Sequence, residues 1–167
     1  DQKEYPEAEA KLQAAIGNLE KAGGQVSSQM VEVMDLLATV LTMQGKYVDS
    51  EPILRQLIEL RKKLSGPDYP ALVNDLMKLG QTSIQLARFA NAGEFLKEAL
   101  VVQEKRLGAG HPAQAATKLW LARALRGQKK VPEAKRYFVE AIDIFKKRPE
   151  FESVLPTTLM ELGVMLR

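Results

Sequence analysis

Hydrophobic positions in this 167-residue chain recur with the spacing of one face of an α-helix, and the pattern returns every 42 residues. Segments that begin at Lys3, Gly45, Ala87 and Lys129 align without a gap. Four aligned columns lie at offsets 0, 4, 7 and 8, which share one helical face. The columns are Ala8, Ser50, Ala92 and Ala134; Leu12, Leu54, Leu96 and Phe138; Ala15, Leu57, Ala99 and Ala141; and Ile16, Ile58, Leu100 and Ile142. The spacing predicts one helix repeated four times.

A second set of helices is predicted between these four. The pairs Leu37-Ala38, Leu79-Gly80 and Leu121-Ala122 are 42 residues apart, and Leu162-Gly163 follows after 41. Each pair is expected where the first helix of a unit approaches the backbone of its partner. We therefore expect helices at about 6–21, 28–44, 48–63, 71–86, 90–105, 113–127, 132–147 and 154–166, and no strands.

Proline and glycine indicate where these helix pairs begin and end. The segments "KKLSGPDYP" and "EKRLGAGHP" contain Gly66 with Pro70 and Gly108 with Pro112, again 42 residues apart. Glycine suits the residue after a helix end. Proline suits the first helical turn, where its missing N–H has no partner to lose. Each segment is predicted to connect one helix pair to the next.

The residues in these columns resemble a known repeat family. Leu79-Gly80, Ala92, Leu96 and Ala99 match the tetratricopeptide pattern, whose unit is usually about 34 residues. The longer unit, with "GKYVDSEPILRQLIELRKKLSGPDYP", resembles the subclass typified by kinesin light chain. The resemblance implies an all-α, right-handed superhelical solenoid of antiparallel helix pairs. It also implies a concave face, lined mostly by the first helices, that binds a peptide or helix of another protein.

The repeat divides the chain into a single array of residues 1–167. We expect a half repeat at 1–27, repeats at about 28–69, 70–111 and 112–152, and a final single helix at 153–167. The first unit lacks its first helix and the last unit ends after its first helix. Because open solenoid ends expose apolar surface, we expect a fragment of a longer array or ends that something else covers.

Composition limits the chemistry that the chain can perform. Hydrophobic residues make up 46% and charged residues 27%, as in ordinary globular domains. The absence of cysteine excludes disulfides and thiolate sites. No apolar run is long enough to span a bilayer. We expect no enzymatic activity, cofactor, metal, small-molecule substrate or membrane insertion. A cytoplasmic location is the working expectation, with periplasmic and organellar locations left open.

Few residues even resemble catalytic or metal-binding groups. His111 is the single histidine, so neither a histidine metal cluster nor a histidine-based triad can form. It precedes Pro112 and is interpreted as a turn residue. Asp68 and Asp75 flank a helix start, where carboxylates favour the positive end of the helix dipole. We interpret both as capping, solvated residues.

The tetratricopeptide register supplies candidate residues for a peptide-binding groove. Trp120 lies one helical turn from Arg123, and tryptophan and arginine are frequent in binding hot spots. Two interpretations of Trp120 stay open, a groove contact and a packing residue between helices. Methionines suit an adaptable groove but also fill cores. The candidates are Asp35, Thr39, Asn74, Met77, Lys78, Gln81, Leu119, Trp120, Arg123, Arg126 and Met160, and Leu36, Glu161 and Val164 occupy further positions of the same register.

The charge distribution bears on the partner. Residues 1–60 carry a net charge of −5 and residues 61–167 a net charge of +8. We expect a protein segment with apolar and acidic residues as the partner. The basic runs at 61–63, 129–130 and 146–148 are interpreted mainly as helix caps. Self-association through the open ends, for example as a homodimer, is an alternative. Nucleic-acid binding is less favoured because acidic residues interrupt the basic part.

Overall fold

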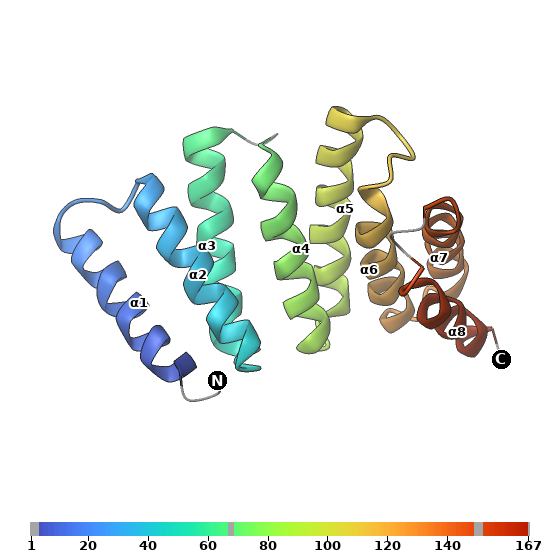
Figure 1. Cartoon of the computed structure of the whole chain (residues 1–167), viewed down its shortest axis with the longest axis horizontal. Coiled ribbons are helices and arrows are strands. Elements are labelled where there is room, and N and C mark those ends of the chain that lie inside the picture. Colours follow the sequence, from blue (N-terminus) through green and yellow to red (C-terminus); the bar gives the residue numbers. More distant parts are fainter. Residues whose placement is uncertain (1–3, 67–68, 149–151, 167) are drawn as a thin grey trace.

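The computed structural model describes residues 4–66, 69–148 and 152–166, and these residues form a row of helices (Figure 1). Each helix begins and ends within two residues of the range that the hydrophobic spacing predicts, and the described residues contain no strand. The helices are α1 Glu4–Lys21, α2 Ser28–Met43, α3 Tyr47–Ser65, α4 Pro70–Gln85, α5 Phe89–Leu107, α6 Gln114–Gly127, α7 Val131–Lys146 and α8 Leu155–Met165. The all-α prediction is confirmed. Asp68 lies outside the described residues.

Helix ends follow the glycine and proline pattern. Gly66 and Gly108 follow α3 and α5 with φ angles of 84° and 81°, a region that residues with a side chain rarely adopt. Pro70 is the first residue of α4, as expected. α6 differs, because it begins at Gln114 rather than next to Pro112. The buried Gln114 amide donates to the Gly108 carbonyl and accepts from the Gly110 N–H, which shapes this longer turn.

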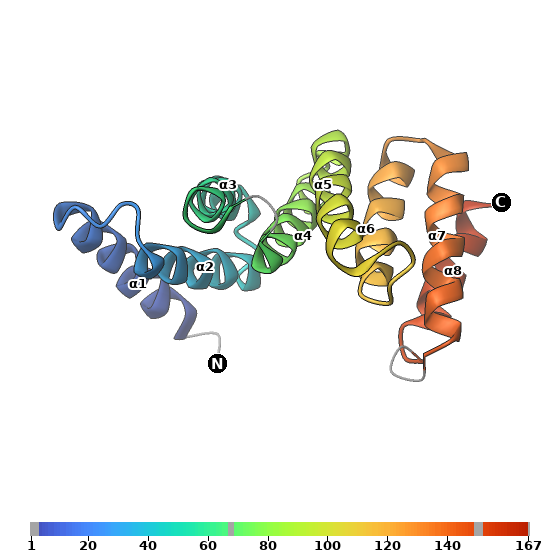
Figure 2. The same cartoon turned by 90° about the horizontal axis from the view of Figure 1, so that it is seen from above.

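Consecutive helices pack in antiparallel pairs, and α4 and α6 also touch each other. We call α2, α4, α6 and α8 the first helices, and α1, α3, α5 and α7 the second helices. Figure 2 shows α3 above α2, and Figure 1 shows α8 in front of α7. In these two pairs the first helix and the second helix thus lie in different layers of the solenoid.

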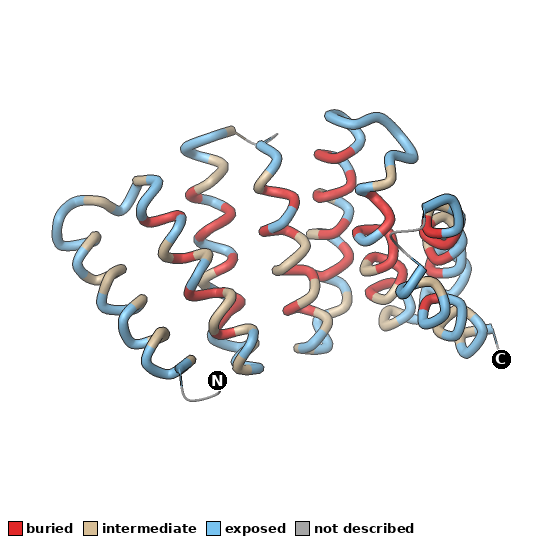
Figure 3. The backbone as a smooth tube through the Cα atoms, viewed as in Figure 1, coloured by how far each residue is buried: buried red, intermediate tan, exposed pale blue. Residues whose placement is uncertain are grey.

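The repeated columns form the core of the central units. In α3, α5 and α7 all twelve column residues are buried (Figure 3). Gly80 shows why a small residue follows leucine in the first helix. A Cβ atom at Gly80 would lie 2.7 Å from Cγ of Leu96, so only glycine lets α4 and α5 approach this closely. The expected close contact is present between α4 and α5.

Candidate functional site

The candidate groove residues come mainly from one surface of the solenoid, which we call the first-helix face. α2 contributes Asp35 and Thr39, and α8 contributes Met160. The central helices contribute the remainder: Asn74, Met77, Lys78 and Gln81 from α4, and Leu119, Trp120, Arg123 and Arg126 from α6. Most of the partly exposed candidates fall into two clusters, one between α2 and α4 and the other between α6 and α8.

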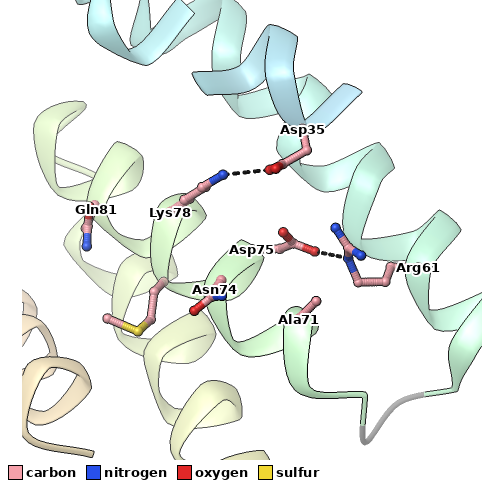
Figure 4. A pocket seen from close by; sticks show the side chains of 8 residues that line it. Asp35, Arg61, Ala71, Asn74, Asp75, Lys78 and Gln81 are labelled. Carbon is pink, nitrogen blue, oxygen red and sulfur yellow. Dashed lines mark hydrogen bonds and ion pairs between the residues drawn. The ribbon is translucent and has the colours of Figure 1, made fainter. Parts of the chain in front are cut away.

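The first cluster surrounds a hollow of about 330 Å³ that we call the polar pocket (Figure 4). Its rim is formed by α2 and α4, and Arg61 reaches it from the last turns of α3. Five of the candidate residues line it, together with three that were not proposed. The lining residues are Asp35, Arg61, Ala71, Asn74, Asp75, Met77, Lys78 and Gln81.

An ion pair crosses the rim of the polar pocket. Nζ of Lys78 donates to Oδ1 of Asp35 at 2.6 Å and to Oγ1 of Thr39 at 3.2 Å. The Thr39 hydroxyl itself donates to the backbone carbonyl of Asp35 at 2.8 Å, which orients it for Lys78. The side chains of Lys78 and Asp35 are 37% and 36% exposed, so solvent weakens the pair and leaves it open to exchange.

A second ion pair lies at the base of the polar pocket. Asp75 is 2% exposed and accepts a hydrogen bond from Nε of Arg61, which comes from the last turns of α3 (Figure 4). Burial raises the pKa of the Asp75 carboxyl above its ordinary value, and the hydrogen bond from Arg61 opposes that rise. The prediction that Asp75 is a solvated capping residue was wrong. Arg61 likewise pairs with a buried carboxylate instead of only capping its helix.

The repeat register carries a signal for this buried pair that our sequence analysis missed. Asp75 shares its position with Thr117 and Thr158, and both are fully buried. Arg61 shares its position with Gln103 and Phe145, which are also buried. Two opposite charges at core positions of neighbouring helices indicate an ion pair, because an isolated buried charge is too costly.

Three further residues of α4 complete the polar pocket. Asn74 is exposed and Gln81 is partly exposed, and neither side-chain amide bonds to another residue in the described part of the chain. Met77 packs against two core clusters, and its sulfur accepts a hydrogen bond from the Thr117 hydroxyl at 3.2 Å. Met77 therefore both fills the core and lines the pocket. The two amides are available to a ligand.

The second cluster, which we call the tryptophan ladder, consists of Trp120, Arg123, Arg126 and Glu161. The Arg123 guanidinium lies 4.4 Å from the centroid of the Trp120 ring. It also donates to both carboxylate oxygens of Glu161, at 2.5 to 3.2 Å. Arg126 adds a contact of 3.4 Å to the same carboxylate. The ladder thus links α6 to α8 through an indole, a guanidinium and a carboxylate.

The side chains of the tryptophan ladder are less accessible to a ligand than the rim of the polar pocket is. Trp120 is half-buried and packs against a core cluster, which fits the packing interpretation of this residue. The side chains of Arg123 and Glu161 are only 22% and 16% exposed. A bidentate arginine–carboxylate pair in such a setting is stronger than an exposed one. The ladder is therefore suited to holding α8 in place.

Leu119 differs from the expectation that it lines a groove. It is buried in a cluster with Phe138 and Phe145 of α7. Phe145 occupies the register position that Arg61 has in α3, and this apolar residue belongs to the same buried cluster as Leu119. Leu119 therefore belongs to the core. Met160 is well exposed on α8, as the register predicts.

The described residues offer little to a metal or a membrane. No three histidine, cysteine, aspartate or glutamate side chains among them are grouped as metal ligands would be. Within the same residues, no helix is both long and apolar enough to cross a bilayer. His111 is exposed in the turn before α6, where its Nδ1 accepts from the Ala113 N–H at 3.2 Å. The turn interpretation of His111 is confirmed.

Solved structures share this fold at low sequence identity. A putative kinesin light chain from Podosopora anserina with nearly identical TPR-like repeats has a TM-score of 0.76 and 18% identity, covering 99% of this chain and 89% of that chain. BtubC (BKLC) from P. vanneervenii has a TM-score of 0.71 and 19% identity, covering 96% and 65%. The first TPR of Spaghetti (RPAP3), bound to the HSP90 peptide SRMEEVD, has a TM-score of 0.58 and 17% identity, covering 83% and 98%.

Sequence comparisons agree with this likeness. A Clustered mitochondria protein homolog of Candida albicans is 26% identical over 102 residues, which is 61% of this chain but only 8% of that protein. Tetratricopeptide repeat models match residues 31–71 and 75–147, together about two thirds of the chain. With its right-handed solenoid of antiparallel helix pairs, this chain belongs to the tetratricopeptide repeat family, and its repeats resemble those of kinesin light chain.

Proposed function

We propose that this chain is a protein-interaction scaffold that binds an extended or helical segment of a partner protein on its first-helix face, at the polar pocket. The observation that carries the proposal is the hollow of about 330 Å³ with the unbonded amides of Asn74 and Gln81 on its lining. Each amide offers both donors and an acceptor, which is what a peptide backbone requires. A related fold in complex with a peptide is consistent with this role.

The rest of the first-helix face defines the chemistry of the partner segment beyond the pocket. Leu36, Met160 and Val164 are exposed on the first-helix face and offer contacts to apolar side chains. Lys78 and Arg126 have partly exposed cationic groups for an acidic side chain. Because Lys78 is already paired with Asp35, an acidic residue of the partner exchanges with Asp35. We therefore expect charge to add little affinity and to act mainly on specificity and the association rate, while the apolar contacts supply most of the affinity.

Ion pairs within the chain favour a protein-binding role over nucleic-acid binding and catalysis. Many cations of the basic part are paired with carboxylates of the same chain, among them Lys62 with Glu98 at 2.9 Å and Lys118 with Glu140 at 2.7 Å. Nucleic-acid binding needs a stripe of cations that are free to contact phosphates. Catalysis needs converging titratable groups, and the buried Asp75–Arg61 pair is closed by its own hydrogen bond.

The test uses peptides selected from a displayed random library against the wild-type chain. Their dissociation constants are then measured by isothermal titration calorimetry with the wild type and with the double variant Asn74→Ala, Lys78→Ala. Loss of two polar contacts should weaken binding at least about tenfold. Both side chains lie at the surface rim, so the helical circular dichroism signal should stay unchanged.

The matched control is Asn91→Ala, Lys97→Ala on α5, a second helix. Asn91 and Lys97 are exposed, and Lys97 also has a surface carboxylate partner, Glu94 at 3.4 Å. This variant should bind the selected peptides as the wild type does. Equal losses in both double variants, or no loss at the pocket, would show that the polar pocket is not where the peptide binds.

A further inference from the structure

A second hollow, which we call the edge hollow, lies where α4 begins and α5 ends. Its volume is about 250 Å³. The first turn of α4 and the last turn of α5 lie at the same edge of the solenoid, the upper edge in Figure 1. Three residues of α4 and three of α5 line the hollow, and these are Pro70, Val73, Asn74, Gln103, Arg106 and Leu107.

Gln103 has a buried acceptor that lacks a donor. The residue is 6% exposed, and its amide nitrogen donates to the Ala113 carbonyl at 3.0 Å. This bond orients the amide, because only its NH2 group can pair with a carbonyl. The amide oxygen is buried and has no hydrogen-bond partner among the described residues. Because buried acceptors are nearly always paired, this oxygen indicates a place for a donor from outside the chain.

Gln114 shows the contrasting case of a buried glutamine with both branches of its amide paired. Its NH2 group donates to the Gly108 carbonyl at 2.9 Å, and its oxygen accepts from the Gly110 N–H at 3.0 Å. The turn between α5 and α6 therefore uses the whole Gln114 amide. Gln103 differs because it lines a hollow and keeps one branch of its amide unpaired.

Asn74 connects the edge hollow to the polar pocket. It lines both hollows, and its side-chain amide bonds to no other residue in the described part of the chain. Asn74 lies one helical turn nearer the start of α4 than Lys78 does (Figure 4). A segment that lies in the polar pocket and follows α4 toward its first turn therefore reaches the edge hollow.

We propose that the partner segment at the polar pocket extends past Asn74 and places a side-chain amide, from glutamine or asparagine, in the edge hollow. This inference rests on the proposed function and adds a specificity to it. The NH2 group of the partner side chain donates to Oε1 of Gln103, and its carbonyl accepts from the Asn74 amide. Its methylene stem contacts Val73 and Leu107, which line the hollow.

Other side-chain classes lack part of this match. A carboxylate has no hydrogen to donate and places a second acceptor against the Gln103 oxygen. A lysine or arginine brings like charge to the Arg106 guanidinium, which also lines the edge hollow. An apolar side chain leaves the Gln103 oxygen unpaired, and sites that hydrogen-bond a ligand reject analogues without the bonding group.

Selection from a displayed random peptide library, on the wild type and on Gln103→Met, tests this specificity. Methionine is close to glutamine in length but has no amide acceptor. Peptides selected by the wild type should carry glutamine or asparagine at a fixed distance from the acidic residue that Lys78 binds. Peptides selected by Gln103→Met should carry an apolar residue there and keep the acidic residue.

A double-mutant cycle then measures the contact itself. A selected peptide is compared with a version that has methionine in place of its amide residue, by isothermal titration calorimetry. This change in the peptide should weaken binding to the wild type about tenfold or more, and binding to Gln103→Met less than about twofold. The wild-type measurements need no protein variant, so they test the amide preference even if Gln103→Met is unstable.

Gln114→Met is the matched control. It removes two hydrogen bonds of a buried glutamine that is not among the residues lining either hollow. The variant should lower the melting temperature but keep the preference for the amide peptide. If it loses that preference as Gln103→Met does, the effect comes from general destabilisation and the assignment to Gln103 is wrong.

The outcomes separate this inference from the proposed function. Selected peptides that depend on Lys78 but show no preference for glutamine or asparagine would overturn the inference and leave the proposed function intact. A library that yields no peptide dependent on Asn74 and Lys78 would overturn both. An amide preference that is unchanged in Gln103→Met would show that the partner amide binds elsewhere.

Discussion

The polar pocket and the tryptophan ladder occupy the same register positions of neighbouring first helices, yet their structures differ. Lys78 of α4 corresponds to Trp120 of α6, and Gln81 corresponds to Arg123. In the polar pocket the ion pair between Lys78 and Asp35 at the rim is more than one-third exposed and borders a hollow. In the ladder the arginine lies between an indole ring and a carboxylate and is mostly covered.

The difference teaches that one repeat position can serve two purposes. α4 lies between neighbouring helix pairs and is well packed, so its outward residues are free to contact a partner. α8 contacts α7 less extensively than the inner helices contact their partners, and the ladder adds polar contacts that fix it. We therefore expect changes at the pocket rim to alter binding, and changes in the ladder to alter stability.

The largest expected effect concerns the ion pair at the base of the polar pocket. Arg61→Met leaves the buried Asp75 carboxylate without its partner, and this should lower the free energy of unfolding by about 3 kcal/mol. Urea denaturation measures the change. The control is Lys62→Met, whose ion pair with Glu98 lies at the surface, and its cost should be below about 1 kcal/mol. Equal costs would show that Arg61 does not support the pocket.

The loss of unfolding free energy in Arg61→Met should depend on pH. Burial raises the pKa of folded Asp75 above 3.8, its ordinary value, so the folded state holds the proton more tightly than the unfolded state. Protonation of Asp75 therefore stabilises the folded state. This contribution to the unfolding free energy is fully present below pH 3.8 and is lost as the pH rises through the pKa of folded Asp75. Removing Arg61 raises that pKa further. The deficit of Arg61→Met relative to the wild type should therefore shrink as the pH is lowered toward 4. A constant deficit would contradict the burial argument.

The next effect concerns the ladder. Glu161→Gln removes the carboxylate that pairs with Arg123 and Arg126, and we expect a loss of about 2 kcal/mol. Hydrogen exchange should show faster exchange of the α8 amides, while α4 amides keep their protection. Glu94→Gln, which removes a well-exposed carboxylate of an i,i+3 pair, should cost less than about 0.5 kcal/mol. Unchanged protection of the α8 amides in Glu161→Gln would show that the ladder does not hold α8 in place.

A third prediction compares the interiors of α4 and α6. Thr82 and Ser83 of α4 are buried, and their hydroxyls have no hydrogen-bond partner among the described residues, whereas α6 has Ala124 and Leu125 at these positions. Thr82→Val keeps the shape and removes an unpaired hydroxyl, so it should raise the unfolding free energy by about 1 kcal/mol. Thermal denaturation measures this gain. Ser50→Ala, where the hydroxyl bonds to the Ala38 carbonyl at 3.2 Å, should lower stability instead.

The smallest effect on stability is expected at the pocket rim. Asp35→Asn releases Lys78 from an exposed ion pair, so the unfolding free energy should change by less than about 0.5 kcal/mol. The freed ammonium should bind acidic peptides more tightly than the wild type does, as measured by fluorescence anisotropy. Neutral versions of the same peptides provide the control. Tighter binding of both versions would mean that the effect does not come from charge.

The sequence could predict the helices and their packing columns because these depend on local information. Hydrophobic spacing determines which face of a helix is buried, and Gly66 and Pro70 mark ends that few other residues favour. The four column residues of α5, which are Ala92, Leu96, Ala99 and Leu100, are all buried, as the spacing predicts. These features can be predicted from the sequence because every unit of the repeat has the same packing geometry.

The candidate site was harder to predict because it depends on residues that break the repeat. Leu119 is buried in a cluster that includes Phe145, the α7 residue equivalent to Arg61. The buried Asp75 is paired with Arg61, which reaches it from another helix. Whether Lys78 or Arg123 is free depends on an acid 38 to 43 residues away. Side-chain pairing over such separations follows from tertiary packing and not from helical periodicity.

The most direct test of a partner-binding pocket on α2 and α4 is a nuclear magnetic resonance titration of the labelled chain with a library-selected peptide. We predict that the largest amide shifts fall on α2 and α4, around Asp35, Asn74, Lys78 and Gln81. The second helices α3, α5 and α7 should shift little. Shifts confined to the second helices, or to the tryptophan ladder alone, would contradict the proposal that the polar pocket binds the partner.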